Sequence, residues 1–119
     1  MLKTSEKQVM KAITELLESK YRNRVSAWRN NTGTAFYENK KGSRRRVSYG
    51  LKGSSDYIGL IKPTGRFLGI EAKGDDGKQR KEQSQFADMI TDYGGIYILA
   101  YSADTVEQVL DRYLQSLGK

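Results

Sequence analysis

The sequence contains no cysteine and no histidine among its 119 residues. Without cysteine, disulfide bonds and thiolate zinc sites are excluded, and a reducing compartment fits the chain. Without histidine, there is no histidine-dependent catalytic triad, no imidazole general base and no histidine-ligated metal. Any catalytic site must therefore use carboxylates, lysine, tyrosine or a metal ion with its water.

Long apolar runs are also missing. The first ten residues, MLKTSEKQVM, hold no apolar run long enough for a signal peptide, and no later segment approaches the length of a membrane span. We therefore expect a soluble, cytoplasmic protein. The length predicts one domain over residues 1–119. A hydrophobic content of 37%, with one Trp, eight Tyr and three Phe, favours a folded chain over a disordered one.

The net charge is +7, and the basic excess lies in the first half of the chain. Residues 1–52 hold thirteen Lys and Arg against four acids, whereas residues 53–119 hold eight against ten. The densest basic segment is 40–46. A polyanion such as nucleic acid is the natural partner of this charge distribution, and a surface that merely keeps the protein in solution is the alternative.

Hydrophobic periodicity predicts helices over residues 4–20, 78–93 and from about 104, and strands over 25–29, 56–62, 66–73 and 96–101. Residues 34–50 are ambiguous and could pair as a hairpin about 39–42. The order α-β-β-β-β-β-α-β-α indicates a mixed sheet flanked by helices. Ser5 with Gln8 predicts a capping box on the first helix, and Asp104 with Glu107 predicts a cap on the last. The apolar strand 96–101 predicts helical cover on both faces.

Two predicted strands around the turn 63–65 carry a distinctive set of charges. Side chains alternate along a strand, so Glu71 and Lys73 share one face. The turn folds the strands back on each other and can bring Asp56 near Glu71. Two converging carboxylates are costly unless a cation lies between them, and Mg²⁺ prefers oxygen ligands. The pattern therefore predicts a metal-dependent phosphodiesterase.

Two further polar residues fall on predicted inward faces of helices. Glu6 ends the apolar stripe of the first helix, where either the helix dipole favours it or its carboxylate points at something inside. These two interpretations are equally weighted. Gln83 precedes Phe86 by three residues and shares its face, together with Met89 and Tyr93. Its amide can hold a water or a carboxylate there, or have no role.

Taken in order, these residues resemble the PD-(D/E)xK restriction-endonuclease-like nucleases, and more closely their virus-type replication-repair nuclease branch. The matching elements span residues 5–101. They are Glu6, Arg29-Asn30-Asn31-Thr32-Gly33, Gly53-Ser54-Ser55-Asp56, Glu71-Ala72-Lys73, and Gln83 with Phe86. One departure is Ser55, where the superfamily often has proline.

The resemblance implies an α/β restriction-endonuclease-like core of order αβββαβ, to which this chain adds a basic hairpin. It implies a DNA endonuclease that acts on branched DNA or Holliday junctions in replication, repair or recombination, as a homodimer. Asp56, Glu71, Lys73 and Gln83 would be catalytic. The ligands of Mg²⁺, or of Mn²⁺ as a substitute, would be Glu6, Asp56, Glu71 and the carbonyl of Ala72.

Nucleic-acid contacts are expected at basic and amide side chains in the first half of the chain. They are Arg29, Asn30, Lys40, Lys41, Arg44, Arg45, Arg46 and Lys52. Two alternatives remain, a non-catalytic DNA-binding module with the same basic half and an RNA endonuclease on the same fold. A tyrosine-nucleophile strand transferase is a further alternative that is less favoured. Such chemistry usually needs a group of His or Arg side chains around the tyrosine, and this chain has no histidine.

Overall fold

The computed structural model describes residues 2–31 and 33–118. Its elements follow the predicted order, α-β-β-β-β-β-α-β-α. They are α1 (Glu6–Ser19), β1 (Val25–Arg29), β2 (Gly33–Glu38), β3 (Arg44–Tyr49), β4 (Tyr57–Ile61), β5 (Arg66–Ala72), α2 (Lys81–Asp92), β6 (Ile96–Ala100) and α3 (Ala103–Leu117). None of the helices in the described ranges is long and apolar enough to cross a membrane.

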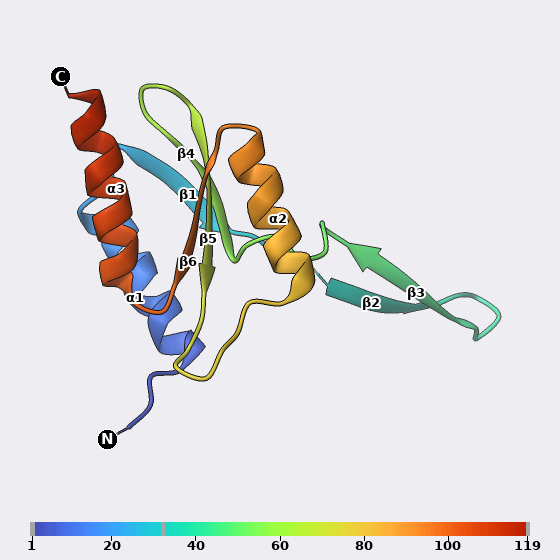
Figure 1. Cartoon of the computed structure of the whole chain (residues 1–119). Coiled ribbons are helices and arrows are strands. Elements are labelled where there is room, and N and C mark those ends of the chain that lie inside the picture. Colours follow the sequence, from blue (N-terminus) through green and yellow to red (C-terminus); the bar gives the residue numbers. More distant parts are fainter. Residues whose placement is uncertain (1, 32, 119) are drawn as a thin grey trace.

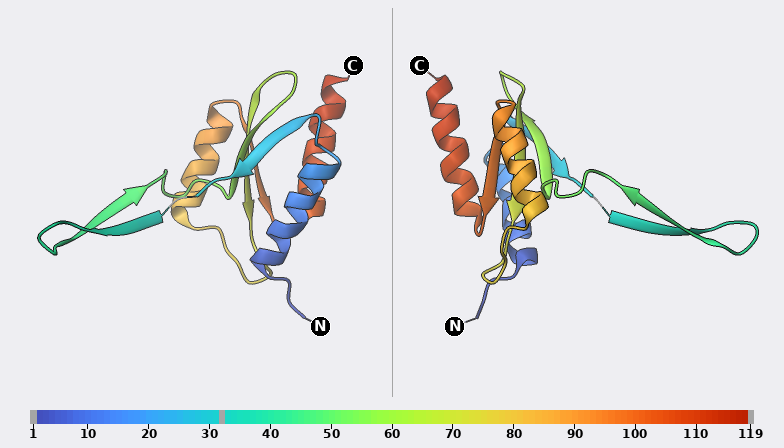
Figure 2. Two further views of the ribbon diagram at one scale, coloured as in Figure 1. Left: turned by 180° about the vertical axis from the view of Figure 1, so that it is seen from behind. Right: turned by 45° about the vertical axis from the view of Figure 1, so that its right-hand side comes forward.

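Four strands form one mixed sheet in the order β1-β4-β5-β6. β1 pairs with β4 and β4 with β5 in antiparallel fashion, whereas β5 and β6 are parallel and α2 connects them. Helices α1 and α3 lie together on one face of the sheet, and α2 lies on the other (Figures 1 and 2). The predicted mixed α/β fold, a sheet flanked by helices, is confirmed.

The core lies between the sheet and the pair α1 and α3. Leu68, Ile70 and Ala72 alternate along β5 and are fully buried on this face. Burying one aliphatic side chain of this size contributes about 1.5–3 kcal/mol. The helical residues that meet them recur every three or four positions and are Val9, Ile13, Leu17, Val106 and Leu110. This alternation turns the odd-numbered residues at the end of β5 toward the opposite face, where α2 lies.

Capping hydrogen bonds define the start of α1, and a surface ion pair links its end to α3. The predicted capping box is present on α1, where Gln8 N donates to Ser5 Oγ and Ser5 N donates to Gln8 Oε1. At the other end of α1, Lys20 Nζ lies 2.8 Å from Asp111 Oδ2 of α3. This pair is partly exposed, so it contributes little beyond orienting the two helices.

The structure corrects several predicted boundaries. Helix α2 begins at Lys81 rather than at 78, because Arg80 takes the extended N-cap conformation. Tyr93, predicted to face inward, is 86% exposed beyond the last turn of α2. Helix α3 begins at Ala103 with Ser102 at its N-cap, so Asp104 lies in the first turn and is not the cap. β6 has the expected helices on its faces, but it is an edge strand of the sheet.

Strands β2 and β3 form a separate two-stranded hairpin, which we call the arm (residues 33–49). Its turn is closed by Asn39, whose Oδ1 accepts from Lys41 N and Ser43 N at 2.9 Å each, and Gly42 adopts a φ of 81°. The arm extends away from the rest of the molecule in every view (Figures 1 and 2). The hairpin that the sequence left ambiguous is therefore present.

Candidate active site

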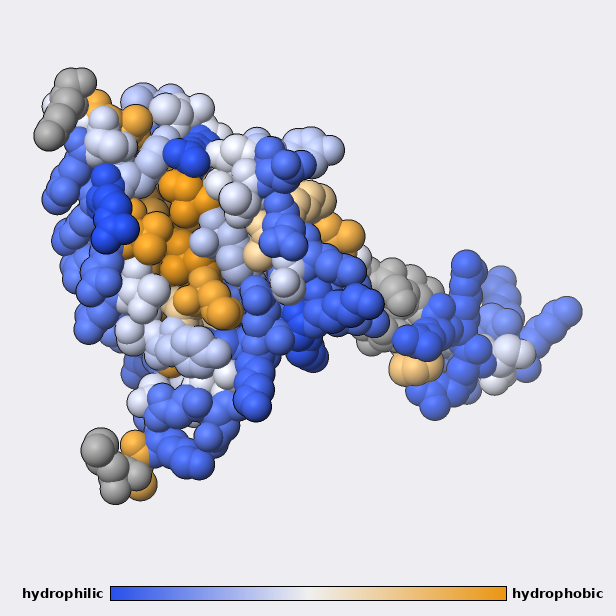
Figure 3. Space-filling view, in the orientation of Figure 1, coloured by the Kyte–Doolittle hydropathy of each residue, from blue (hydrophilic) through white to orange (hydrophobic). Residues whose placement is uncertain are grey.

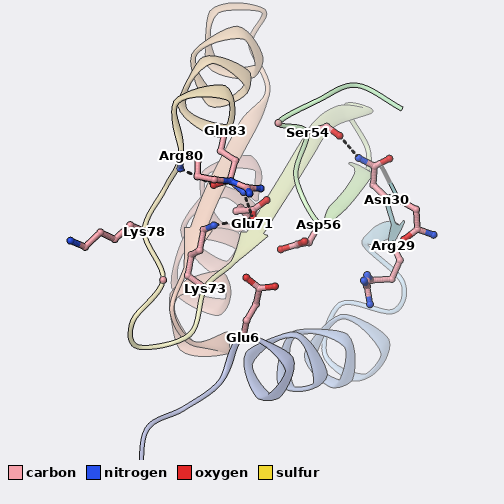
Figure 4. Close-up of a pocket in the computed structure, with 13 residues that line it drawn as sticks. Glu6, Arg29, Asn30, Ser54, Asp56, Glu71, Lys73, Lys78, Arg80 and Gln83 are labelled. Atoms are coloured by element: carbon pink, nitrogen blue, oxygen red, sulfur yellow. Dashed lines mark hydrogen bonds and ion pairs between the residues drawn. The ribbon is translucent and has the colours of Figure 1, made fainter. Parts of the chain in front are cut away.

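Five segments meet at one end of the sheet and enclose a cavity of about 520 Å³. They are the first turn of α1, the end of β1, the loop before β4, the end of β5, and the segment leading into α2 (Figure 4). The lining is almost entirely polar: Glu6, Arg29, Asn30, Asn31, Gly53, Ser54, Asp56, Glu71, Lys73, Gly77, Lys78, Arg80 and Gln83.

Asp56 and Glu71, which we call the acidic pair, lie beside each other as predicted. The antiparallel register places Tyr57 opposite Ile70, so the residues that flank them are also neighbours. Asp56 Oδ2 accepts from the backbone N of Ala72 at 2.8 Å, which fixes this carboxylate at the end of β5.

Gly53 positions the loop that carries Asp56. It adopts a φ of +85°, a region that side chains disfavour. A Cβ at this position would also lie 2.4 Å from the backbone O of Glu82 in the first turn of α2. The loop can therefore pack against α2 only with glycine here. Ser55, where the nuclease superfamily often has proline, is buried and donates from Oγ to Tyr57 O at 2.8 Å.

The carboxylate of Glu71 is buried, with 3% of the residue exposed. Its Oε2 accepts from Gln83 Nε2 at 2.8 Å and lies 3.6 Å from Lys73 Nζ. Its Oε1 is buried and has no hydrogen-bond partner among the described residues. Burial first, and then the charge of Asp56, raise the pKa of Glu71 from 4.5 to about 7, although Lys73 acts in the opposite direction.

Gln83 connects the acidic pair to the start of α2. While its Nε2 donates to Glu71, its Oε1 accepts from the backbone N of Arg80 at 2.9 Å. The side chain is 4% exposed. Of the contacts that the sequence allowed, the amide thus makes the one with a carboxylate, and it orients Glu71.

Glu6 points toward the same space from the opposite side of the cavity (Figure 4). It is an exposed first-turn residue of α1, and its charge adds to the raised pKa of Glu71. Glu6 therefore fits both interpretations: it lies in the first helical turn, where the helix dipole favours an acid, and its carboxylate points into the cavity. The loop after β5 holds it there, because Asp75 N donates to Thr4 O at 2.9 Å and Thr4 N donates to Asp75 Oδ2 at 2.8 Å.

The four predicted metal ligands are not equally placed. Asp56, Glu71 and Glu6 all line the cavity, whereas Ala72 is fully buried and does not. Within residues 2–31 and 33–118, no three acidic side chains lie close enough to form a compact metal-ligand cluster. The acidic pair is therefore the centre of the site, and Glu6 stands apart from it.

Of the predicted nucleic-acid contacts, Arg29 and Asn30 line the cavity. Asn30 Nδ2 donates to Ser54 Oγ at 2.7 Å and to Ser55 O at 3.0 Å, which ties the end of β1 to the loop before β4. The other predicted contacts lie outside the cavity and are exposed. Lys40, Lys41, Arg44, Arg45 and Arg46 belong to the arm, and Lys52 pairs with Glu82 at 3.5 Å.

Sequence reasoning did not assign four polar residues of the cavity to the site, Asn31, Ser54, Lys78 and Arg80. The signal was the basic run 78–81 directly before Gln83. Assigning that run to the interior of a helix hid it, because exposed helical lysines and arginines are common. In the structure residues 78–80 precede α2, and two of their three side chains line the cavity.

The residues present fit a divalent cation. Carboxylate oxygens are the ligands that Mg²⁺ prefers, and the acidic pair provides them at one point. A buried carboxylate oxygen without a partner is costly, and Glu71 Oε1 is such an atom. A cation beside the acidic pair would satisfy that oxygen and offset the repulsion that raises the pKa of Glu71.

Comparisons with known proteins leave the resemblance to nucleases as a prediction from these residues alone. No protein-family model, no curated protein and no solved structure matches the chain.

Proposed function

We propose that this protein is a divalent-metal-dependent nuclease that hydrolyses phosphodiester bonds in DNA. The observation that carries the proposal is the buried carboxylate of Glu71, which has one unpartnered oxygen and lies between Asp56, Lys73 and Gln83. A pair of acids that can hold a metal ion, beside an ammonium group, is an arrangement with which a protein without histidine can hydrolyse phosphodiester bonds. The restriction-endonuclease-like core and its virus-type replication-repair branch are part of this proposal.

In this mechanism the acidic pair holds Mg²⁺, with Mn²⁺ as a substitute, and Glu6 adds negative charge from the opposite side of the cavity. When bound, the cation promotes the ionisation of water near neutral pH and offsets charge on the phosphate. Gln83 keeps the carboxylate of Glu71 in place by donating to Oε2. The carbonyl of Ala72 is a further ligand in this proposal, although Ala72 is not among the residues that line the cavity.

The chain's own cations act on the substrate. Lys73 lies 3.6 Å from Glu71, so its ammonium group can contact a phosphate oxygen and stabilise negative charge as it develops. Arg29, Lys78 and Arg80 line the cavity and would bind the neighbouring phosphates. The attacking water gives up one proton to solvent as its oxygen bonds to phosphorus. The bond from phosphorus to one sugar oxygen breaks, and that oxygen leaves with a proton from solvent.

The substrate of the proposed enzyme is DNA, branched DNA or Holliday junctions in particular, with a role in replication, repair or recombination. The exposed basic residues support a nucleic-acid partner, because counterion release makes Lys and Arg clusters bind phosphate backbones. Preference for branched structures rests on the nuclease resemblance.

The homodimer is also part of the proposal. β6 is an edge strand with the sequence Ile-Tyr-Ile-Leu-Ala, and Ile96, Tyr97 and Leu99 are only partly buried. Figure 3 shows a hydrophobic patch between α3 and α2, in the region of β6. An apolar edge strand is prone to pair with another chain, and a second copy is the simplest one. Sedimentation of the native protein across a concentration series tests this.

The central experiment compares the wild type with Glu71→Gln and Lys73→Met on labelled DNA in a Mg²⁺ titration. The substrates are duplex, flap and four-way-junction DNA, and RNA of the same sequences. We expect scission by the wild type that depends on Mg²⁺ and is lost in both variants, while binding at low salt persists. Asp88→Asn, an exposed acid on α2 that does not line the cavity, is the matched control.

Each alternative predicts a different pattern in the same experiment. Tight, metal-independent binding without scission would indicate a non-catalytic DNA-binding module. Faster cleavage of RNA than of DNA would indicate the RNA endonuclease. Undiminished cleavage by both variants would exclude Glu71 and Lys73 from the mechanism.

A further inference from the structure

Within the described ranges, the arm does not pack extensively against the rest of the protein. Its two strands pair over six residues each, and among the described elements they make extensive contacts only with each other. A two-stranded hairpin is at best marginally stable in water unless something covers it. The arm is therefore expected to gain order from a molecule that binds it.

The charge of the arm identifies the class of that molecule. Five basic residues and one acid, Glu38, give residues 33–49 a net charge of +4, out of +7 for the chain. All five basic side chains are exposed, and none forms an ion pair within the part of the chain that is described. Unneutralised charge at this density fits a phosphodiester backbone.

Two aromatic residues add to this match. Phe36 and Tyr37 are consecutive on β2, so they lie on opposite faces of the arm, and they are 56% and 59% exposed. The guanidinium of Arg44 lies 4.7 Å from the centre of the Phe36 ring. Aromatic rings among arginines are typical of surfaces that bind nucleic-acid strands. An acidic protein surface would not need exposed rings on both faces.

The base of the arm lies at the cavity. Asn30 and Asn31 lie three and two residues before the start of β2, and Gly53 and Ser54 follow β3 by a few residues; all four line the cavity. The hydrogen bond from Asn30 to Ser54 closes this base. The arm then extends in one direction only, and its outer part is mostly hydrophilic on the surface seen in Figure 3.

The length of the arm sets a distance along the substrate. The eight residues from Asn31 to the turn at Asn39, at about 3.3 Å each, reach roughly 26 Å from the cavity. Successive phosphates on one strand of DNA are about 3.4 Å apart along the helix axis. Along a duplex that runs parallel to the arm, the basic tip would therefore lie about seven or eight nucleotides from a phosphate in the cavity.

We infer that the arm makes binding one-sided at each active site: it contacts the backbone over about seven nucleotides on one side of the cut, and the described residues of the same chain provide no equivalent on the other side. The position of the cut rests on the proposed function. The arm accordingly determines how close to a strand end the enzyme can act. Backbone in duplex form and backbone in single-stranded form share this chemistry, and the test separates them.

The variant that tests the tip is Lys40→Ser/Lys41→Ser. Its matched control is Arg22→Ser/Lys62→Ser, which removes two exposed positive charges at the end of the sheet away from the cavity. Both are made in the wild type and in a Glu71→Gln background. Affinity is measured without metal on oligonucleotides that lengthen in steps of two, as duplexes and as single strands.

In the Glu71→Gln background with its arm intact, affinity should keep rising until the DNA extends about seven nucleotides past the cavity. In the tip variant it should level off at a shorter length, because the remaining basic residues of the arm, Arg44, Arg45 and Arg46, lie nearer the cavity. On long DNA the tip variant should bind about tenfold more weakly, with a salt slope smaller by about two. In Mg²⁺, the wild type should leave about seven nucleotides uncut at one kind of end only. The tip variant should cut closer to that end, and the control variant should behave as the wild type.

Three results would overturn the inference. The tip variant could need DNA of the same length as the protein with an intact arm, or the wild type could leave equally long uncut segments at both kinds of end. The third is a tip variant that no longer forms a dimer while its length requirement is unchanged. The last would assign the arm to a second copy of the chain. If no DNA is cut but the length difference persists, the nuclease proposal fails and the reach of the arm is supported. Cleavage without a length difference rejects the arm inference alone.

Discussion

The sheet with its helices and the arm solve opposite problems with charge. At the cavity, charged groups are withdrawn from water: Glu71 is 3% exposed and Lys73 is 6% exposed. Glu71 accepts a hydrogen bond from Gln83 and forms an ion pair with Lys73. On the arm, the basic side chains stay in water and make no ion pairs within the described residues. One chain can therefore hold two kinds of charged group apart. The groups in the cavity need an exact placement, whereas the groups on the arm matter through their number.

This contrast has an energetic basis. Withdrawing a carboxylate from water costs several kcal/mol unless other groups compensate, and only a packed core can hold those groups in place. Exposed charges remain hydrated and so carry no desolvation cost. They bind a polyanion through counterion release, which does not require an exact geometry. Substitutions in the two regions should therefore have different effects, and the following predictions use that difference.

The largest effect should come from Asp56→Asn. The amide still accepts from Ala72 N but loses the charge that holds the cation, so the cleavage rate should fall by about a thousandfold or more. DNA binding should change less than threefold, because the arm is untouched. Rate and affinity measured on the same labelled DNA check this split, and equal losses of both would mean that the two regions are not separate.

Core and arm should also differ in their contribution to stability. Leu68 is fully buried on β5, so Leu68→Ala should lower the free energy of unfolding by about 2–5 kcal/mol. Phe36→Ala on the arm should change it by less than about 0.5 kcal/mol, because the ring is more than half exposed. Urea denaturation of both variants measures the two values. A large loss for Phe36→Ala would show that the arm packs on the rest of the protein in solution.

The raised pKa of Glu71 predicts a dependence of stability on pH. In the folded protein this pKa is about 7, and its ordinary value is 4.5, so the folded state binds the proton more tightly. The stabilisation is fully present below about pH 4.5 and is lost as pH rises through 7. Without metal, the free energy of unfolding of the wild type relative to Glu71→Gln should therefore fall by about 2–3 kcal/mol between pH 4.5 and 8.

Magnesium gives this prediction a second readout that does not need catalysis. At pH 8, Mg²⁺ should raise the melting temperature of the wild type, because a cation bound only to the folded state stabilises it. It should leave Glu71→Gln unchanged. Calorimetry with Mg²⁺ and with EDTA measures this difference, and an equal shift in both proteins would place the cation elsewhere.

The smallest effect should come from Arg80→Gln. Arg80 lines the cavity, whereas the adjacent Lys81 does not, so Lys81→Gln is a close control with the same change of charge. Loss of one phosphate contact at the cavity should raise KM by about three- to tenfold for Arg80→Gln. The kcat should change little for either variant. An equal effect in both would mean that net charge alone is being sensed.

Much of the fold could be predicted because the spacing of apolar residues along the sequence shows which side of each helix or strand is buried. Alternation along β5 indicated that Glu71 and Lys73 share a face, and the turn 63–65 indicated that Asp56 lies near Glu71; both hold in the structure. The register followed from the same pattern, since a slip by one residue would bury Glu71 among the core residues of the opposite face.

The contacts that complete the site could not be predicted. Gln83 could hold a water, a carboxylate or nothing, and only the position of α2 on the sheet decides that it holds Glu71. Arg80 resembled a helical surface residue until its extended conformation turned it toward the cavity. Tyr93 satisfied the helical period but lies past the last turn, where no sheet remains to cover it. Each case depends on a tertiary distance that periodicity does not contain.

One detail of the sheet bears on how such a protein could change over time. The ladder between β1 and β4 continues past Arg29, because Asn30 N donates to Asp56 O at 2.8 Å, directly at the site. The chain that leaves at Asn30 and returns at Ser54 is thus an insertion between two strands that are already joined. The part of it between Asn31 and Gly53 could therefore change in length and composition, or be replaced by grafting, while the residues that line the cavity stay in place.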